Sequence, residues 1–400
     1  MHQFDFHTVK TKFMQCICNP FGGFSRYVLA LMWVAGALLA VTGCKKDDDK
    51  PALVIPESYD GSNYSSRTAT QYAVRGQLNA LVSECKKGRT QGFVVSLDAF
   101  NNLYAVAGAP TLRSITTPYY DGKLSGPDGW LAELAKSSGG SYAPGAPTGG
   151  QGGVFGPYLF DENGLELEQL VEKGLFGAAL YNHAVALMQG EITEATVDQL
   201  VAIFGAHPDF PNTPTASKAT NPDAFMANYA ARRDKNDGNG LYSQIKRAFI
   251  KLQAAVKAGA DYNKERDEAL AELQLLWEKV NFATVINYSH TVIRLMSNTN
   301  PTDAERASAL HSYGEAVGFT HGWRTIPQQY RRITDAQIDQ ILTRLNAQPN
   351  AVPTSYLFIT SPAAQLPKLQ QNIAQLKEIY GFTDAEIEDF KENWVAKQGR

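Results

Sequence analysis

Histidine is the side chain whose type and placement in this sequence most directly suggest chemistry. Five of the seven histidines fall in segments with a helical pattern in the middle and C-terminal parts of the chain: His183, His207, His290, His311 and His321. An imidazole in such a place can bind a metal or a ligand, and it can equally be a core residue that hydrogen bonds to a polar neighbour. The sequence leaves both interpretations open for each histidine.

His311 and Glu315 stand four residues apart in a predicted helix, so their side chains share one face. That spacing is typical of paired metal ligands. No HExxH pattern occurs in the chain, so the sequence does not support the zinc site of a zincin-type protease. The cofactor is therefore unknown: the residues allow a metal, but they do not form a complete metal motif.

A short pattern with a tyrosine, a histidine and a valine occurs twice, each time late in a long amphipathic segment. The two copies are Tyr181-x-His183-x-Val185 and Tyr288-x-His290-x-Val292. This repetition predicts a duplicated helical bundle with a polar cleft between its halves. The candidate binding residues of that cleft are Tyr181, His183, His207, Tyr288, His290, His311 and Glu315. We assign no catalytic residue.

Tyr288 and His290 lie on a long helix that is predicted over Leu270–Met296. Its apolar residues recur at spacings of three, four and seven, and no Pro or Gly interrupts the run. A helix of about 27 residues is roughly 40 Å long, enough for the spine of a bundle. Capping boxes that start at Thr302, Thr334 and Thr383 predict further helices near 303–321, 335–346 and 384–396.

A second long helix is predicted over Leu165–Met188. It contains Gly174 and Gly177, and each glycine destabilises a helix by about 1 kcal/mol relative to Ala. Their presence predicts that a neighbouring helix crosses closely there. The preceding segment, 137–157, is rich in Gly and Pro and predicts a long loop. It is not a phosphate-binding loop, because no strand precedes it and no GK[ST] element follows.

Strand patterns are scarce, and Val352–Thr360 is the best candidate. The predicted fold is therefore all-α, with two related helical bundles, long loops and no substantial sheet. The first bundle would cover about 59–260 and the second about 261–400. The chain is 44% hydrophobic and 19% charged with a net charge of −3, which is ordinary globular composition. The chain has no excess of Lys and Arg over Asp and Glu, which argues against a nucleic-acid partner.

The N-terminus carries a targeting pattern. Arg26 precedes an apolar run over 27–40, which has the length of a signal-peptide core and is short for a transmembrane helix. The run ends in Val-Thr-Gly-Cys44, which resembles a bacterial lipobox. We therefore predict a signal peptide over 1–43, lipidation of Cys44 and a tether over 44–58. Cys85 is the remaining cysteine of the mature chain and is predicted to be buried, without an intrachain disulfide.

Lysine and aspartate follow Cys44 directly, in the order Lys-Lys-Asp-Asp-Asp-Lys over residues 45–50. A solvated linker would have this composition. The arrangement is also similar to the surface-export signal of Bacteroidetes lipoproteins. We therefore expect an outer-membrane lipoprotein exposed on the cell surface, with the periplasmic leaflet of the same membrane as the alternative.

Several segments resemble a Bacteroidetes lipoprotein family called domain of unknown function 4856. They are residues 158–183, 232–236, 277–293, 311–319 and 331–338. The family is similar to the imelysin group, which implies an all-helical protein of two related bundles with a cleft between them. Some imelysin-like proteins are metallopeptidases, and others accompany iron uptake. The group carries a Gly-x-His-x-x-Glu element. Here Gly205 and His207 match it, but Phe210 replaces the Glu, which counts against peptidase activity and a metal site.

Three functions follow as expectations. The first is non-catalytic binding of a small molecule, a metal or another envelope protein, with the lipid on Cys44 holding the chain to the membrane and with a link to iron or nutrient uptake. The alternative is a metal-dependent imelysin-like peptidase that acts in the cleft between the bundles. The third is a structural partner of another envelope protein. The sequence favours a protein that is not an enzyme.

Overall fold

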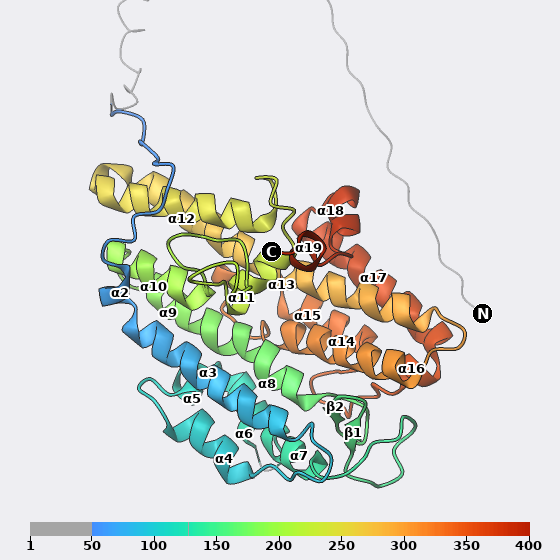
Figure 1. The fold of residues 1–400 in the computed structure, drawn as a ribbon. Coiled ribbons are helices and arrows are strands. Elements are labelled where there is room, and N and C mark those ends of the chain that lie inside the picture. Colours follow the sequence, from blue (N-terminus) through green and yellow to red (C-terminus); the bar gives the residue numbers. More distant parts are fainter. Residues whose placement is uncertain (1–49, 127) are drawn as a thin grey trace, which may run out of the picture. The chain divides into compact units, whose positions relative to one another are not determined.

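The computed structural model describes residues 50–126 and 128–400 (Figure 1). The predicted signal peptide and the lipidation site at Cys44 lie outside these residues. Ala52–Arg400 forms one compact unit. Its first helices are α2 (Tyr64–Arg67), α3 (Ala69–Lys87), α4 (Leu97–Asn101), η1 (Asn102–Val106), α5 (Leu112–Ile115), α6 (Pro118–Ser125), α7 (Trp130–Ser137), α8 (Leu167–Leu175), η2 (Phe176–Tyr181), α9 (Asn182–Gln189) and α10 (Glu194–Phe204). They are followed by α11 (Phe225–Arg232), α12 (Leu241–Ala258), η3 (Ala260–Tyr262), α13 (Asn263–Met296), α14 (Asp303–His321), η4 (Gln328–Tyr330), α15 (Asp335–Arg344), α16 (Leu357–Thr360), α17 (Pro362–Tyr380), α18 (Asp384–Asp389) and α19 (Trp394–Gln398).

The all-α prediction is confirmed. Among the described residues the sheet consists of two three-residue strands, β1 (Gly153–Phe155) and β2 (Tyr158–Phe160), which pair antiparallel. The hairpin closes through Gly156, whose φ of +58° suits a tight turn. β1 falls at the end of the predicted glycine-rich loop. The strand prediction at Val352–Thr360 is wrong, because its last four residues form α16.

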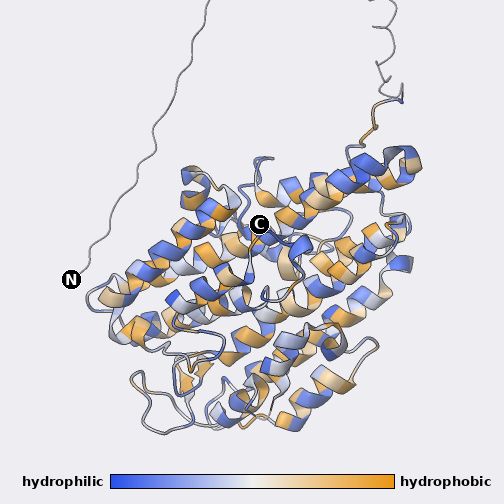
Figure 2. Cartoon of the chain, turned by 180° about the vertical axis from the view of Figure 1, so that it is seen from behind, coloured by the Kyte–Doolittle hydropathy of each residue, from blue (hydrophilic) through white to orange (hydrophobic). Residues whose placement is uncertain are grey.

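Helix α13 is the predicted spine. It extends over 34 residues, about 50 Å at 1.5 Å per residue, and packs against α11, α12, α14 and α17. Trp277, Val280 and Ile286 are fully buried along it. Hydrophobic and hydrophilic residues alternate along most helices in Figure 2, as expected for helices that cover a common core. No described helix is long and apolar enough to cross a membrane.

The predicted helix over Leu165–Met188 forms as three joined pieces: α8, the π-helical turn η2 and α9. Helix α14 crosses α8 at glycines on both sides. A Cβ on Gly177 would lie 2.6 Å from the Gly322 carbonyl oxygen, and a Cβ on Gly318 would lie 2.4 Å from the Gln169 carbonyl oxygen. The close crossing predicted from Gly174 and Gly177 is therefore confirmed.

The predicted helix starts in the C-terminal third are confirmed as well. Thr302, Thr334 and Thr383 each accept a hydrogen bond from the backbone three residues on, and the residue there bonds back in a capping box. Cys85 is fully buried, as predicted, and forms no disulfide within the part of the chain that the structure describes. The predicted division of 59–400 into related bundles near residue 260 stays a prediction.

Candidate functional site

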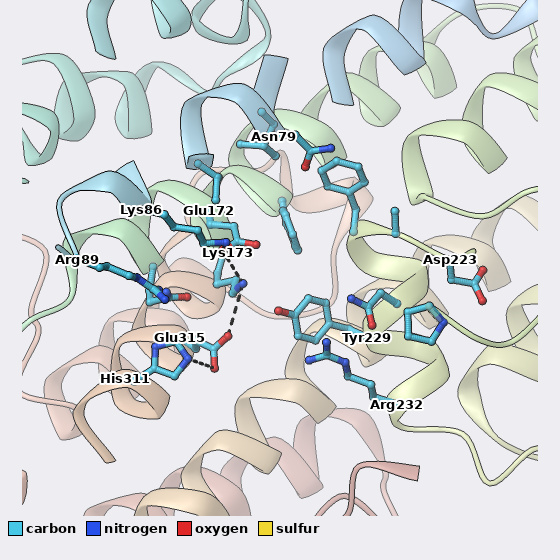
Figure 3. A pocket seen from close by; sticks show the side chains of 18 residues that line it. Asn79, Lys86, Arg89, Glu172, Lys173, Asp223, Tyr229, Arg232, His311 and Glu315 are labelled. Atoms are coloured by element: carbon cyan, nitrogen blue, oxygen red, sulfur yellow. Dashed lines mark ion pairs between the residues drawn. The ribbon is translucent and has the colours of Figure 1, made fainter. Parts of the chain in front are cut away.

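A cavity of about 470 Å³ opens between α3, α8, α11 and α14 (Figure 3). Most of its labelled side chains are charged. They come from four parts of the chain: Lys86 and Arg89 from α3 and the turn after it, Glu172 and Lys173 from α8, Arg232 from α11, and His311 and Glu315 from α14. The cavity therefore joins segments that are more than 200 residues apart in sequence, within one compact unit.

Lys173 lies on the α8 wall, with its ammonium group almost fully buried. Its Nζ lies 2.9 Å from Glu172 Oε2 and 3.5 Å from Glu315 Oε1. Burial lowers the pKa of a lysine, but here the charge of Glu172 and the neighbouring Tyr229 and Glu315 outweigh it, so the pKa is raised and the group stays charged. Lys173 thus holds two carboxylates together at the centre of the site.

Arg89 closes one side of the cavity. Its Nε lies 2.6 Å from Glu168 Oε2, and an Nη lies 2.8 Å from Glu166 Oε1. Both carboxylates are buried. Burial, followed by the charge of Glu166, raises the pKa of Glu168 to about 7. The guanidinium therefore compensates two acids that the hydrophobic surroundings of α8 would otherwise not tolerate.

His311 and Glu315 are brought together as the spacing predicts. His311 Nδ1 lies 2.6 Å from Glu166 Oε2, and its Nε2 lies 3.5 Å from Glu315 Oε2. The ring stacks on Tyr158 of β2 at a centroid distance of 4.1 Å. Burial lowers the pKa of His311, but the two carboxylates outweigh it and raise the pKa above its usual value. His311 therefore holds its proton more tightly than an exposed histidine does.

The opposite wall is α11. Phe225 begins this helix with a φ of +47°, a backbone conformation that bulky residues rarely adopt and that is often kept at functional sites. Tyr229 is buried, and the guanidinium of Arg232 lies 5.0 Å from its ring centroid. The π-helical turn η2 begins at Phe176, which also lines the cavity. Such turns are frequent at functional sites.

The other predicted site residues lie outside this cavity. Tyr181 is fully buried, where its hydroxyl donates to the Tyr330 carbonyl at 2.6 Å and its ring stacks on Trp323. His183 lies on α9 with Gln71 at 3.5 Å, and burial lowers its pKa. Tyr181 is thus a core residue, and the half-buried His183 lies beside a polar neighbour. A histidine with a polar neighbour is the alternative that the sequence left open.

His207, Tyr288 and His290 do not line the cavity either. His207 packs edge-on against Tyr64 and contacts Asp209. Tyr288 stacks on Phe319, and burial followed by the charge of Glu315 raises its pKa. Burial lowers the pKa of His290 to about 4, and its Nε2 has no hydrogen-bond partner. Of the predicted residues, the structure thus brings only His311 and Glu315 into the cavity.

A metal site is not visible in the geometry. Within residues 50–126 and 128–400, no group of three or more His, Cys, Asp and Glu side chains is arranged to hold an ion. His311 with Glu166 and Glu315 is the group most similar to a set of metal ligands. However, Glu166 is bonded to Arg89, and Glu315 lies beside Lys173. The carboxylates that could bind a metal with His311 already have cationic partners.

Most residues that line the cavity do not stand out in the sequence. Glu168 and Lys173 lie among apolar residues on a helix that is buried on nearly all sides. Because buried charges must be paired, such residues signal a polar cluster. Arg232 lies in a segment that carried the family resemblance, but the other charged lining residues come from distant segments and could not be read from spacing.

Comparison of the sequence with protein-family models and with curated proteins, and of the fold with solved structures, found no match. The resemblance to the imelysin-like lipoprotein family therefore stays a prediction.

Proposed function

We propose that this protein is a lipid-anchored envelope protein that binds a small polar ligand in the cavity between α3, α8, α11 and α14 without transforming it. The observation that carries the proposal is the charged lining on packed helices. Lys173, Glu172 and Glu315 hold each other in place on α8 and α14, so the cavity is shaped before a ligand arrives. A preformed concave site of this size suits a small molecule.

The pairing of the charges supports binding over catalysis. A general base works with a free lone pair or carboxylate near the reacting group. Here Glu166 and Glu168 are bonded to Arg89, and Lys173 lies between Glu172 and Glu315. These groups are suited to positioning a polar molecule. Nutrient or iron uptake at the cell envelope is the setting that the resemblance suggests.

A metal-dependent peptidase is the second candidate. The observation in its favour is His311, which lies 2.6 Å from Glu166 and 3.5 Å from Glu315. A metal there would have to displace Arg89 or Lys173 from these carboxylates. This requirement makes the peptidase the weaker proposal.

The test is ligand retention by the purified chain that begins after Cys44, in which Ala52–Arg400 is a compact unit. The protein is exposed to a small-molecule extract of culture medium, washed and denatured, and released molecules are identified by mass spectrometry. Asn79→Trp fills the cavity from an exposed position on α3. Ala80→Trp adds the same side chain at an exposed position that does not line the cavity, and serves as the control.

We expect the wild type and Ala80→Trp to retain the same polar molecule and Asn79→Trp to lose it. The proposal fails if no molecule is retained, or if Asn79→Trp retains it equally. Elemental analysis of the same samples tests the peptidase. The peptidase would be the better proposal if the wild type contained stoichiometric zinc or iron and hydrolysed peptides, and if His311→Ala lost the metal.

A further inference from the structure

One cation in the cavity has no carboxylate within 4 Å among the residues that the structure describes. Among the lining residues that the structure describes, Lys86, Arg89 and Lys173 each lie within 4 Å of a glutamate, at 3.6, 2.6 and 2.9 Å. Arg232 forms no ion pair and no hydrogen bond in this part of the chain, and its guanidinium only lies over the Tyr229 ring. Figure 3 shows it facing the interior of the cavity beside Tyr229.

The environment of Arg232 keeps it charged. Burial lowers its pKa, but Tyr229, Tyr288 and the carboxylates of Glu315 and Glu172 outweigh burial, and the pKa is raised. A partly buried guanidinium has a rigid fork of donors that matches a carboxylate or a phosphate. Because no side chain among the described residues fills this role, the place next to Arg232 is suited to an anionic group of the ligand.

Two hydrogen-bond acceptors in the same cavity are unpartnered. Gln169 is 1% exposed, lines the cavity from α8, and its Oε1 has no partner. Asn228 lines it from α11, one turn from Arg232, and its Oδ1 is buried without a partner. A buried acceptor without a donor is costly. A ligand that donates hydrogen bonds would satisfy both acceptors.

The charges decide which donors fit. An ammonium donor would lie in a cavity that already contains Lys173 and Arg232, while Glu172 and Glu315 are occupied by Lys173. Like charges at such distances repel, and water does not screen them well in a partly buried site. Hydroxyl groups donate equally well and carry no charge. They suit Gln169 and Asn228 better than an amine does.

We propose that the ligand is a hydroxylated organic acid of monosaccharide size, such as a sugar acid. Its carboxylate binds Arg232, and its hydroxyl groups donate to Gln169 Oε1 and Asn228 Oδ1. The inference rests on the proposed binding function and narrows it to one ligand class. The cavity of about 470 Å³ leaves room for a molecule of this size.

The experiment is isothermal titration calorimetry with three matched pairs of probes: glucuronate and glucose, galacturonate and galactose, and gluconate and glucitol. The members of each pair differ in whether a carboxylate is present. At least one acid should bind about tenfold or more tightly than its neutral counterpart, as expected for a charge-assisted pair. Glutamine, which carries both an ammonium and a carboxylate, tests the preference for hydroxyl donors and should bind more weakly than that acid.

Arg232→Gln should abolish the preference for the acid and leave the affinity for the neutral sugar unchanged. Gln169→Leu removes the acceptor at nearly constant side-chain volume. It should lower the binding affinity for the acid and for its neutral counterpart by a similar factor. Arg247→Gln is the matched control, because Arg247 is exposed on α12 and does not line the cavity. Thermal melts show that each variant is folded.

The inference is overturned if every acid binds no tighter than its neutral partner, if glutamine binds more tightly than the acids, or if folded Arg232→Gln keeps the full preference. It is also overturned if the molecule retained in the capture experiment is neutral or cationic. In that last case the binding function stands and only the ligand class fails. If nothing is retained and filling the cavity has no effect, the binding function itself fails.

Discussion

Lys173 is the residue on which the charge balance of the cavity depends. Its Nζ lies 2.9 Å from Glu172 Oε2 and 3.5 Å from Glu315 Oε1, and its side chain is 6% exposed. Burying an unpaired charge costs more free energy than burying the same charge beside an opposite one. Each member of this cluster therefore lowers the cost of burying the others. The same cluster holds α8 against α14 at the wall of the site.

Replacement of Lys173 should therefore unfold the protein more easily than replacement of an exposed lysine in the same network. We expect Lys173→Met to lower the free energy of unfolding by about 3–5 kcal/mol, because the buried Glu315 and the half-buried Glu172 lose the buried cation that lies between them. Lys86→Met should lower it by less than about 1 kcal/mol, since that side chain is 46% exposed. Urea titration followed by circular dichroism measures both values. Equal losses would show that Lys173 is not the central counter-ion.

His311 makes stability depend on pH in a defined direction. Its pKa is raised in the folded state, so the folded chain binds the proton more tightly than the unfolded chain does. The stabilisation is fully present below the unfolded pKa of about 6.5 and is lost as the pH rises through the folded pKa.

His311→Gln should remove this dependence. The difference in unfolding free energy between wild type and variant should be larger at about pH 5.5 than at about pH 8.5, because only the protonated ring gains from Glu166 and Glu315. Urea titrations at both pH values give the difference, in which titrating groups far from His311 cancel. A difference that grows toward high pH would mean that His311 is neutral in the folded protein.

At the scale of elements, the crossing of α8 and α14 sets the distance between the two walls that carry Lys173 and Glu315. Glycines allow the backbones to approach, since a Cβ on Gly318 would lie 2.4 Å from the Gln169 carbonyl oxygen and 3.1 Å from Lys173 Cβ. The close crossing fixes both Gln169 and Lys173 relative to α14.

Gly318→Ala should push the helices apart. We expect a loss of about 1–3 kcal/mol in unfolding free energy, the usual cost of overpacking. Gly76→Ala is the matched control, because Gly76 lies inside α3 with nothing within 4 Å of an added Cβ. It should stabilise the protein by about 0.5–1 kcal/mol, since alanine is the better helix former. Thermal and urea unfolding measure the stability of both variants. If Gly318→Ala left the free energy of unfolding unchanged, the crossing would not be tight.

Features that depend on local sequence could be predicted well. The capping boxes at Thr302, Thr334 and Thr383 started helices where expected, because the two bonds of such a box involve residues only three apart. Helix α13 followed from its apolar spacing. The hairpin of β1 and β2 could not be predicted, since strands of three residues are too short for an alternating pattern.

The cavity could be predicted only in part. His311 and Glu315 share one helix, so their spacing indicated a pair. Arg89, Lys173 and Arg232 lie on separate segments, and only the tertiary fold brings them to one place. The repeated Tyr-x-His-x-Val pattern did not indicate this cavity: Tyr181 lies in the core, and His290 lies on α13, which contributes no residue to the cavity lining.

At the scale of the whole molecule, the proposed location depends on Cys44 and the residues after it. Lipid chains on a cysteine anchor a protein because each buried methylene contributes about 0.8 kcal/mol, so two or more chains make release slow. Binding of a small acid near the membrane would then concentrate the ligand where uptake takes place.

Cys44→Ala should release the protein from the membrane fraction of bacteria that express the full chain, because the thiol that takes the lipid is gone. Wild type should stay with the membrane after salt washing and dissolve in detergent, as expected for an anchor held by apolar burial instead of charge.

Replacing residues 45–50 by alanine should leave membrane attachment intact but protect the protein from protease added to intact cells, if these residues direct it to the surface. Immunoblots of fractions and of protease-treated cells measure both effects. Wild type that is soluble after lysis, or Cys44→Ala that remains in the membrane, would contradict the anchor, whereas protease sensitivity that persists in the alanine variant would contradict only the role of the charged segment.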